Sequence, residues 1–329
     1  MKKGNISIFV PHIGCPQKCS FCNQNTITGQ SNAPTANDVV SAVETALKTE
    51  GYEFEIAFFG GSFTAIDREY MLSLLEAAKP YVESGAVTGI RCSTRPDCVD
   101  GETLETLKEY GVTAIELGAQ SMVDSVLIKN LRGHTAEDVR QASERIKEYG
   151  FELGLQMMTG LYGSTRELDV YTAREIIKSE PKTVRIYPTV VLKNTYLARL
   201  LESGKYVPDT LEETVSLCAE LVLMFEKAGI KIIRLGLHSS DGVKENMLGG
   251  GYHESLGELV QSRILLNKIF ENPVGDYTVY IHEKTISKLK GNKKANITAL
   301  ENAGYRIEIL FDNSLKANEL RLENGIKNS

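Results

Sequence analysis

The sequence lacks any run of 18 consecutive apolar residues, and a membrane-spanning helix needs about that length. Its first residues include two lysines but lack the long apolar region and small-residue cleavage site of a signal peptide. No Gly-x-Gly-x-x-Gly motif follows a predicted strand, so the usual dinucleotide-binding fingerprint is missing. The net charge of −6 argues against a surface coated with positive charge. We therefore expect a cytoplasmic protein with no membrane association.

Cysteine is scarce as well, with six residues in a chain of 329. Cytosolic cysteines are normally reduced, so disulfide bonds are not expected. Three of the six form a close group, Cys15, Cys19 and Cys22, which favours metal or redox chemistry. Cys92 and Cys98 lie near the end of a predicted strand and are more typical of buried, unreactive thiols.

Short apolar runs alternate along the chain with segments of helical periodicity. The runs are apolar on both faces, as in parallel strands covered by helices, and span residues 6–10, 55–59, 89–93, 114–117, 153–158 and 184–187. The helical segments span about 35–47, 67–82, 101–110, 135–149 and 166–178, with Asp67, Asp100 and Thr135 as expected N-caps. Six strand–helix units in a row predict an α/β fold built as a partial or full (β/α) barrel.

A domain boundary is expected near Asn272, Pro273 and Gly275. Residues 1–272 would then form the barrel domain, with a C-terminal extension over about 205–272. That extension contains predicted helices at 211–227 and 255–270 and a predicted strand at 231–237. Residues 273–329 would form a separate small α+β module.

The segment Cys15-Pro-Gln-Lys-Cys19-Ser-Phe-Cys22 directly follows the first predicted strand, where barrel enzymes place their chemistry. These spacings let a tight loop turn three thiolates toward one centre. A [4Fe–4S] cluster takes one thiolate per iron, so three cysteines would leave one iron open to another ligand. A structural zinc site is the alternative; it needs a fourth ligand, for which His12 is the nearest candidate.

The three-cysteine motif, in this position, resembles the radical S-adenosylmethionine (SAM) superfamily. The resemblance implies a [4Fe–4S] cluster whose open iron is chelated by the amino and carboxylate groups of SAM. It further implies reductive cleavage of SAM to a 5′-deoxyadenosyl radical, which abstracts a hydrogen atom from the substrate. An electron donor such as a flavodoxin or a ferredoxin would then be required.

The second predicted strand ends in Phe58-Phe59-Gly60-Gly61-Ser62, and paired glycines let the backbone approach a ligand closely. The resemblance implies that Gly60, Gly61 and Ser62 hold the ammonium group of SAM. It also implies that Ser93, Gln120, Arg132 and Gln156 line the carboxylate and ribose, and that Phe21 packs near the adenine. Related porphyrinogen oxidases carry an acidic residue where Ser93 and Gln156 stand. No residue is assigned as catalytic, and His134 is expected to orient the loop that carries Arg132.

Several segments between about residues 5 and 265 resemble the Elongator catalytic-subunit family, including those at 58–64, 116–121, 130–135 and 185–193. That family modifies the wobble uridine of transfer RNA, and its full-length members carry an acetyltransferase domain for which this sequence has no room after the barrel. One alternative is radical oxidation of a small molecule, as in the oxygen-independent coproporphyrinogen oxidases. Another is a non-catalytic RNA-binding protein that is stabilised by a metal.

The last 55 or so residues offer a separate indication of RNA binding. They read as strand, helix, short loop, helix and strand, which resembles a K-homology (KH) module, whose Gly-x-x-Gly loop clamps single-stranded nucleic acid. The matching loop is Gly291-Asn-Lys-Lys294, with Lys294 in place of the second glycine. Nearby lysines make this stretch basic within an acidic chain, namely Lys284, Lys288, Lys290, Lys293 and Lys294. Transfer RNA is therefore an expected partner.

Overall fold

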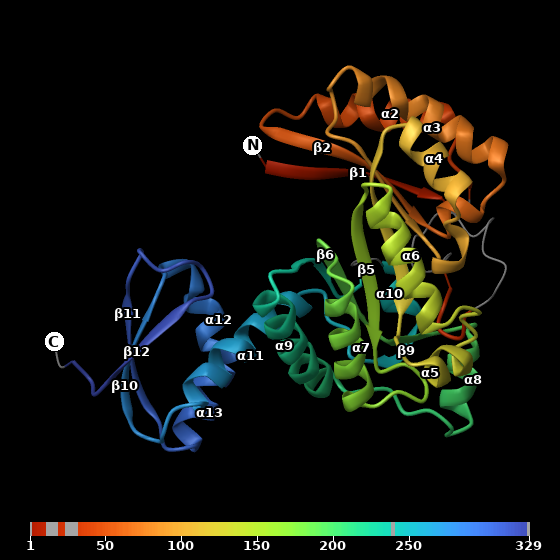
Figure 1. Cartoon of the computed structure of the whole chain (residues 1–329). Coiled ribbons are helices and arrows are strands. Elements are labelled where there is room, and N and C mark those ends of the chain that lie inside the picture. The colour runs from red at the N-terminus through yellow and green to blue at the C-terminus, as the bar shows by residue number, and fades with distance from the viewer. Residues whose placement is uncertain (1, 11–18, 24–31, 238–240, 328–329) are drawn as a thin grey trace. The chain divides into compact units, whose positions relative to one another are not determined.

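A computed structural model describes residues 2–10, 19–23, 32–237 and 241–327 (Figure 1). The chain divides into two compact units, which are described separately here. The first comprises Met1–Asp209 and Met224–Tyr252, and the second comprises Thr210–Leu223 and His253–Ser329. Among the described residues, no helix is both long enough and apolar enough to cross a membrane.

The first unit is built on a curled parallel sheet of seven strands in the order β1-β2-β3-β4-β5-β6-β8. The strands are β1 (Lys2–Val10), β2 (Tyr52–Gly60), β3 (Ile90–Thr94), β4 (Val112–Gln120), β5 (Glu152–Thr159), β6 (Thr183–Pro188) and β8 (Lys231–Leu235). β1 and β8 have no pairing between them in this order, so the sheet is an open half-barrel. Of the two predicted forms, the partial barrel is therefore correct.

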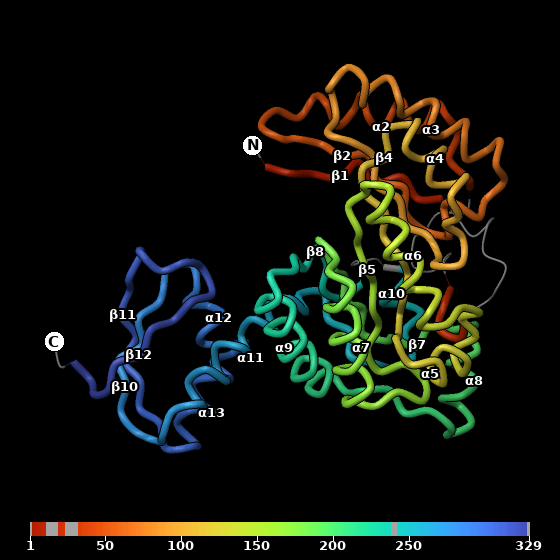
Figure 2. The backbone as a smooth tube through the Cα atoms, in the orientation of Figure 1, coloured from red at the N-terminus to blue at the C-terminus, as the bar shows by residue number. Residues whose placement is uncertain are grey.

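Helices connect successive strands and cover one face of the sheet, as the tube in Figure 2 traces. They are α2 (Ala36–Leu47), α3 (Arg68–Glu83), α4 (Gly101–Glu109), α5 (Asp124–Lys129), α6 (Ala136–Glu148) and α7 (Arg166–Lys178), and the unit also contains α8 (Tyr196–Glu202) and α10 (Asp241–Asn246). α2 packs on β1 and β2, while α6 packs on β4 and β5. The short strands β7 (Val190–Leu192) and β9 (Met247–Gly250) form a separate antiparallel pair that the sequence analysis did not predict.

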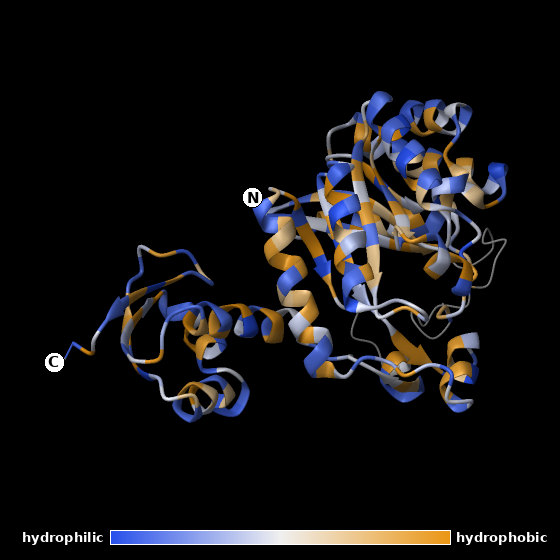
Figure 3. Cartoon of the chain, turned by 60° about the horizontal axis from the view of Figure 1, so that its bottom comes forward, coloured by the Kyte–Doolittle hydropathy of each residue, from blue (hydrophilic) through white to orange (hydrophobic). Residues whose placement is uncertain are grey.

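Local sequence signals explain why these helices begin where they do. The expected N-caps Asp67, Asp100 and Thr135 each accept a hydrogen bond from a backbone N–H of the first helical turn. Thr135 also forms a reciprocal capping box with Asp138. Strand residues such as Phe58 and Ile115 are fully buried, and Figure 3 shows the strands of the large sheet as mainly hydrophobic.

The second unit contains a three-stranded sheet in the order β11-β10-β12. Its elements are α11 (Leu256–Phe270), β10 (Asp276–Ile281), α12 (Ile286–Lys290), α13 (Ala295–Asn302), β11 (Arg306–Phe311) and β12 (Leu320–Asn324), and α9 (Leu211–Lys227) begins in it. β10 pairs in parallel with β11 and antiparallel with β12. The predicted order of strand, helix, loop, helix and strand is present, and β12 is an additional strand.

Candidate functional site

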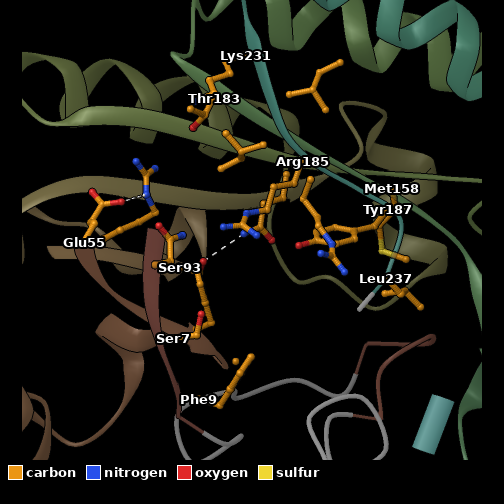
Figure 4. A pocket seen from close by; sticks show the side chains of 18 of the residues that line it. Ser7, Phe9, Glu55, Ser93, Met158, Thr183, Arg185, Tyr187, Lys231 and Leu237 are labelled. Atoms are coloured by element: carbon orange, nitrogen blue, oxygen red, sulfur yellow. Dashed lines mark hydrogen bonds and ion pairs between the residues drawn. The ribbon is translucent and has the colours of Figure 1, made fainter. Parts of the chain in front are cut away.

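The uncovered face of the half-barrel lines a cavity of about 910 Å³ (Figure 4). Alternate residues of the strands face it, as the two-residue period of a strand requires, for example Ser7 and Phe9 on β1. Six of the predicted site residues line the cavity: Phe21, Cys22, Gly60, Ser93, Gln120 and Gln156. Gly61, Ser62, Arg132 and Cys19 are not among the lining residues.

Two of the three predicted metal ligands can be placed. Cys19 is buried and Cys22 is partly buried, and a hydrogen bond from Cys22 N to Cys19 O closes the turn between them. Cys15 and His12 lie outside the described residues. Within the described part of the chain, no group of three His, Cys, Asp or Glu side chains could hold a metal ion.

The end of β2 lies against β1 so closely that only glycine fits at residue 60. Gly60 has a φ of 117°, and a Cβ atom there would lie 2.3 Å from the carbonyl oxygen of Val10. Gly61 N donates a hydrogen bond to the same oxygen. Ser62 is buried; its Oγ lies 2.8 Å from Thr94 Oγ1 and accepts a hydrogen bond from Arg95 N. The Ser62 side chain therefore holds the loops after β2 and β3 together.

Arg132 reaches from the loop before α6 to the cysteine segment. Its Nη1 donates to Cys19 Sγ at 3.1 Å and its Nη2 donates to Gly118 O at 2.7 Å. Arg95 Nη2 donates to the carbonyl oxygen of Arg132 and fixes the backbone there. Nε of Arg132 and Oε1 of Gln120 are both buried and have no partner among the described residues. Buried polar atoms without a partner are rare in proteins, so these two fit a site that is completed by a ligand.

Ser93 and Gln156 are linked across the sheet, and Gln156 is also held by a residue that the sequence analysis did not select. Gln156 Nε2 donates to Ser93 Oγ at 3.2 Å and to Glu116 Oε2 at 2.9 Å. Glu116 is 1% exposed and lies opposite Gly154 on β5, where a Cβ atom would come within 2.8 Å of Glu116 Cγ. The glycine therefore makes room for the carboxylate.

Glu116 belongs to a series of buried ion pairs that also includes Glu55, Arg91 and Arg185. Arg185 donates to both carboxylate oxygens of Glu116, from Nε at 2.5 Å and from Nη2 at 2.9 Å, and its guanidinium lies 4.7 Å from the centre of the Phe59 ring. Arg91 donates to Glu55 at 2.8 Å, and its Nη1 lies 3.6 Å from Glu116. Burial lowers the pKa of Arg185, but the bonds to Glu116 outweigh it and raise the pKa overall. Arg185 therefore stays charged inside the cavity.

Comparison with known proteins identifies the family of this chain. A model described as the radical SAM superfamily matches residues 9–175, which is half of the chain. The chain belongs to the radical SAM superfamily. A second model, described as the Radical_SAM C-terminal domain, matches residues 181–265 of this radical SAM protein.

Curated relatives of this radical SAM protein include enzymes named for transfer RNA. The tRNA uridine(34) acetyltransferase of Dehalococcoides mccartyi is 27% identical over 239 residues, which cover 62% of this chain and 52% of the relative. Elongator complex protein 3 of Homo sapiens is 29% identical over 191 residues, covering 52% of this chain and 35% of the relative. The chain thus spans about half or less of the length of these two relatives.

Solved structures agree on the fold of this radical SAM protein. The Elp3 protein of the archaeon Methanocaldococcus infernus has a TM-score of 0.65 at 22% identity, covering 84% of this chain and 66% of that chain. Coproporphyrinogen III oxidase of Escherichia coli has a TM-score of 0.50 at 16% identity, covering 69% of this chain and 53% of that chain. The first shares the radical SAM half-barrel over most of the present chain.

Radical SAM enzymes use a [4Fe–4S] cluster together with SAM. Cys19 and Cys22 would offer a cluster two thiolates, and Cys22 lines the cavity. Gly60 leaves a backbone surface without a side chain, and Gln120 and Arg132 each have a buried polar atom without a partner among the described residues. These groups would suit SAM, which presents an ammonium, a carboxylate and hydroxyls.

Burial shifts the pKa values of three other candidates, His134, Cys92 and Cys98. Burial, followed by the charge of Arg132, lowers the pKa of His134 to about 4, so the ring is neutral near pH 7. His134 Nε2 lies 3.2 Å from Ala119 O, which ties the Arg132 loop to β4 as expected. Burial raises the pKa of the Cys92 thiol to about 12, which confirms the prediction of an unreactive cysteine. Burial also raises the pKa of Cys98.

Proposed function

We propose that this radical SAM enzyme modifies transfer RNA at the wobble uridine of the anticodon. The observation that carries the proposal is the similarity of more than half of the chain to relatives named tRNA uridine(34) acetyltransferase. The archaeal Elp3 structure, which shares the fold, points in the same direction. The transferred group is left open, because the chain spans only part of those relatives.

In this proposal Cys15, Cys19 and Cys22 ligate the cluster, and the cavity beside Cys22 takes SAM. The bound cofactors supply a 5′-deoxyadenosyl radical, and the chain orients them and excludes water. Gly60, Gly61 and Ser62 receive the ammonium, Arg132 and Gln120 the carboxylate and ribose, and Phe21 the adenine. Gln156 uses both hydrogens of Nε2 on Ser93 and Glu116. Its Oε1 accepts no hydrogen bond among the described residues, so it is left as an acceptor for a ribose hydroxyl.

Residues 273–329 are proposed as the KH-like module that contacts the RNA, with residues 1–272 as the catalytic domain. The loop at Gly291 has an unusual backbone, with φ of 74° at Gly291, 50° at Lys293 and 63° at Lys294. Lys293 and Lys294 are exposed, whereas Lys288 is paired with Glu258. Two unpaired charges on a tight turn suit the phosphate backbone of a single strand.

The remaining partners follow from the chemistry. Reductive cleavage of SAM needs one electron, so a flavodoxin or a ferredoxin is proposed as the donor. Reduced cysteines and an oxygen-sensitive cluster fit the cytoplasm.

Anaerobic reconstitution followed by reduction tests the enzyme assignment. The protein should cleave SAM to 5′-deoxyadenosine, and replacement of any one of Cys15, Cys19 or Cys22 by Ala should abolish the cleavage. A matched Cys218→Ala variant, which changes a buried cysteine outside the motif, should keep it. Cleavage that persists in the three motif variants, or zinc found without iron, would overturn the assignment.

Mass analysis of transfer RNA nucleosides from a deletion strain tests the substrate. A wobble-uridine modification should disappear from the deletion strain and return with the wild-type gene, but not with the Cys19→Ala gene. An unchanged nucleoside profile, together with no binding of transfer RNA in a gel-shift assay, would instead favour oxidation of a small molecule.

A further inference from the structure

We propose that Asn130 is a positioning residue for the iron–sulfur cluster. By clamping Ser20, it holds the segment 19–23, with Cys19 and Cys22, in its final shape before any metal is bound. This inference rests on the proposed function, because it takes those two cysteines as cluster ligands.

The clamp consists of two hydrogen bonds between the same two residues. Ser20 N donates to the carbonyl oxygen of Asn130 at 3.1 Å, and Ser20 Oγ donates to Asn130 Oδ1 at 2.6 Å. Both residues are fully buried, with 0% exposure. Because one bond involves the backbone and the other the side chain, Ser20 is fixed in both position and orientation. Cys19 precedes it directly.

Asn130 is itself anchored on its far side. Its Nδ2 donates to Val126 O at 2.8 Å and to Tyr162 O at 2.9 Å, so it joins the end of α5 to the loop after β5. The amide thus uses its oxygen on Ser20 and both of its hydrogens on the scaffold. An aspartate would keep the acceptor but lose the two donors, and an alanine would lose all three bonds.

Further contacts hold the segment in addition to the bonds from Asn130. Leu197 N donates to Ser20 O at 2.8 Å, and Asn23 Nδ2 donates to Lys193 O at 3.1 Å. Phe21 packs against two apolar clusters, one of which includes Leu197 and the other Val126. The cysteine segment is therefore held at Ser20 and at Asn23 by hydrogen bonds between protein groups.

Holding a ligand segment in advance lowers the entropy that must be lost when the cluster binds. The ligands also dissociate more slowly, because a released thiolate stays in place to rebind. Asn130 should therefore control how long the cluster persists, and the polar groups behind metal ligands commonly change metal affinity by about tenfold to a hundredfold.

The test compares Ser20→Ala and Asn130→Ala with a matched control, Ser143→Ala. Ser143 is another buried hydroxyl, 1% exposed, which donates to Val139 O within its own helix, α6. Each variant is reconstituted without oxygen. Iron and sulfide content are measured, and the loss of cluster absorbance is followed after addition of an iron chelator. The thermal unfolding of the metal-free proteins is recorded in parallel.

Ser20→Ala and Asn130→Ala should lose the cluster about tenfold faster than wild type, whereas Ser143→Ala should match wild type. Asn130→Asp, which keeps the bond to Ser20 but not the anchoring donors, should also lose the cluster faster. If Asn130→Ala does not fold, Ser20→Ala alone decides, since it removes a single bond. Wild-type rates of cluster loss in Ser20→Ala would overturn the clamp.

The Cys19→Ala and Cys22→Ala variants separate this inference from the proposal beneath it. If both keep full iron content, the ligand assignment fails and the clamp falls with it. If both lose the cluster while Ser20→Ala and Asn130→Ala behave as wild type, only the clamp fails.

Discussion

Arg132 donates a hydrogen bond to the sulfur of Cys19 across 3.1 Å, although 113 positions separate the two residues in the sequence. The same guanidinium holds Gly118 O through a second nitrogen. A planar fork with several donors can bridge two acceptors in this way, whereas a lysine ammonium is a compact charge on a flexible stem. The arginine therefore joins the cysteine segment to the end of β4.

Arg132→Lys should weaken SAM binding by roughly tenfold to a hundredfold, since a hydrogen bond to a charged group contributes about 1.5–3 kcal/mol. SAM affinity is measured by equilibrium dialysis on the reconstituted protein. Arg140→Lys is the control, because Arg140 forms a partly exposed pair on α6 and should bind SAM normally. Equal affinities for the two variants would contradict a role for Arg132 in SAM binding.

Gly60→Ala should destabilise the fold by more than the strain of its backbone alone. Positive φ costs a non-glycine residue about 1–3 kcal/mol, and at residue 60 the new methyl group also meets Val10 O. Gly85→Ala is a matched control with a φ of 71° and nothing within 4 Å of the added Cβ. Urea unfolding should show a larger loss of stability for Gly60→Ala, and equal losses would rule out the clash.

Removing one partner of the buried pair Glu116–Arg185 should lower the free energy of unfolding by more than removing both partners does. Glu116→Leu leaves Arg185 charged and unpaired inside the cavity, at a cost of about 3–5 kcal/mol in unfolding free energy. The double variant Glu116→Leu with Arg185→Met should recover part of this loss. The prediction fails if the double variant is at least as unstable as Glu116→Leu.

Asp169 should make stability fall as the pH rises toward neutrality. The carboxyl is 3% exposed and accepts hydrogen bonds from Gly160 N and Ser164 Oγ. Burial raises its pKa from 3.8 to about 7, so the folded chain binds this proton more tightly than the unfolded chain does. The stabilisation is complete below about pH 4 and is lost as the pH rises through about 7. Each pKa unit corresponds to about 1.4 kcal/mol.

Urea unfolding of wild type and Asp169→Asn between pH 5 and about 8 measures this contribution. Asp169→Asn should lack the part of the pH dependence of the unfolding free energy that comes from residue 169. Asp209→Asn should reduce the slope, because the charge of Asp209 helps to raise the pKa of Asp169. Identical slopes in wild type and Asp169→Asn would exclude the effect.

Lys293→Glu with Lys294→Glu should weaken binding of transfer RNA and flatten its dependence on salt, since each phosphate contact releases counterions. Lys316→Ala changes another exposed lysine of the same unit and should leave both properties unchanged. Lys294→Gly removes the charge without straining the backbone, because glycine accepts the φ of 63° at residue 294. This variant should therefore unfold no more easily than wild type. Unaltered affinity in the double Glu variant would remove the loop from the RNA site.

The sequence was sufficient to predict a partial or full (β/α) barrel, because its strands are short apolar runs and its helices carry clear N-caps, but it left the choice between the two forms open. The segment predicted at 166–178 coincides with α7, and the run at 153–158 lies within β5. The β7–β9 pair was missed because strands of three and four residues owe their form to a partner far along the chain.

The polar interior was harder to predict than the strands. Glu116 is the only charged residue in the predicted apolar run at 114–117. Its function depends on Arg185 and on the space at Gly154, and both come from other strands. The period of two along β4 relates Glu116 to the other residues of its face, which is the signal that could have found it. The roles of Ser93, Gln120 and Gln156 toward SAM remain predictions.

Opposite charges face one another across the barrel interior: Arg91 on β3 pairs with Glu55 on β2, Glu116 on β4 and Glu152 on β5, and Glu116 also pairs with Arg185 on β6. Each charge is balanced by partners on other strands, so substitutions at these positions should be energetically coupled although the positions lie far apart in the sequence. In homologues, loss of any of these charges should be accompanied by a change at the facing position, and natural variants should exchange them in pairs.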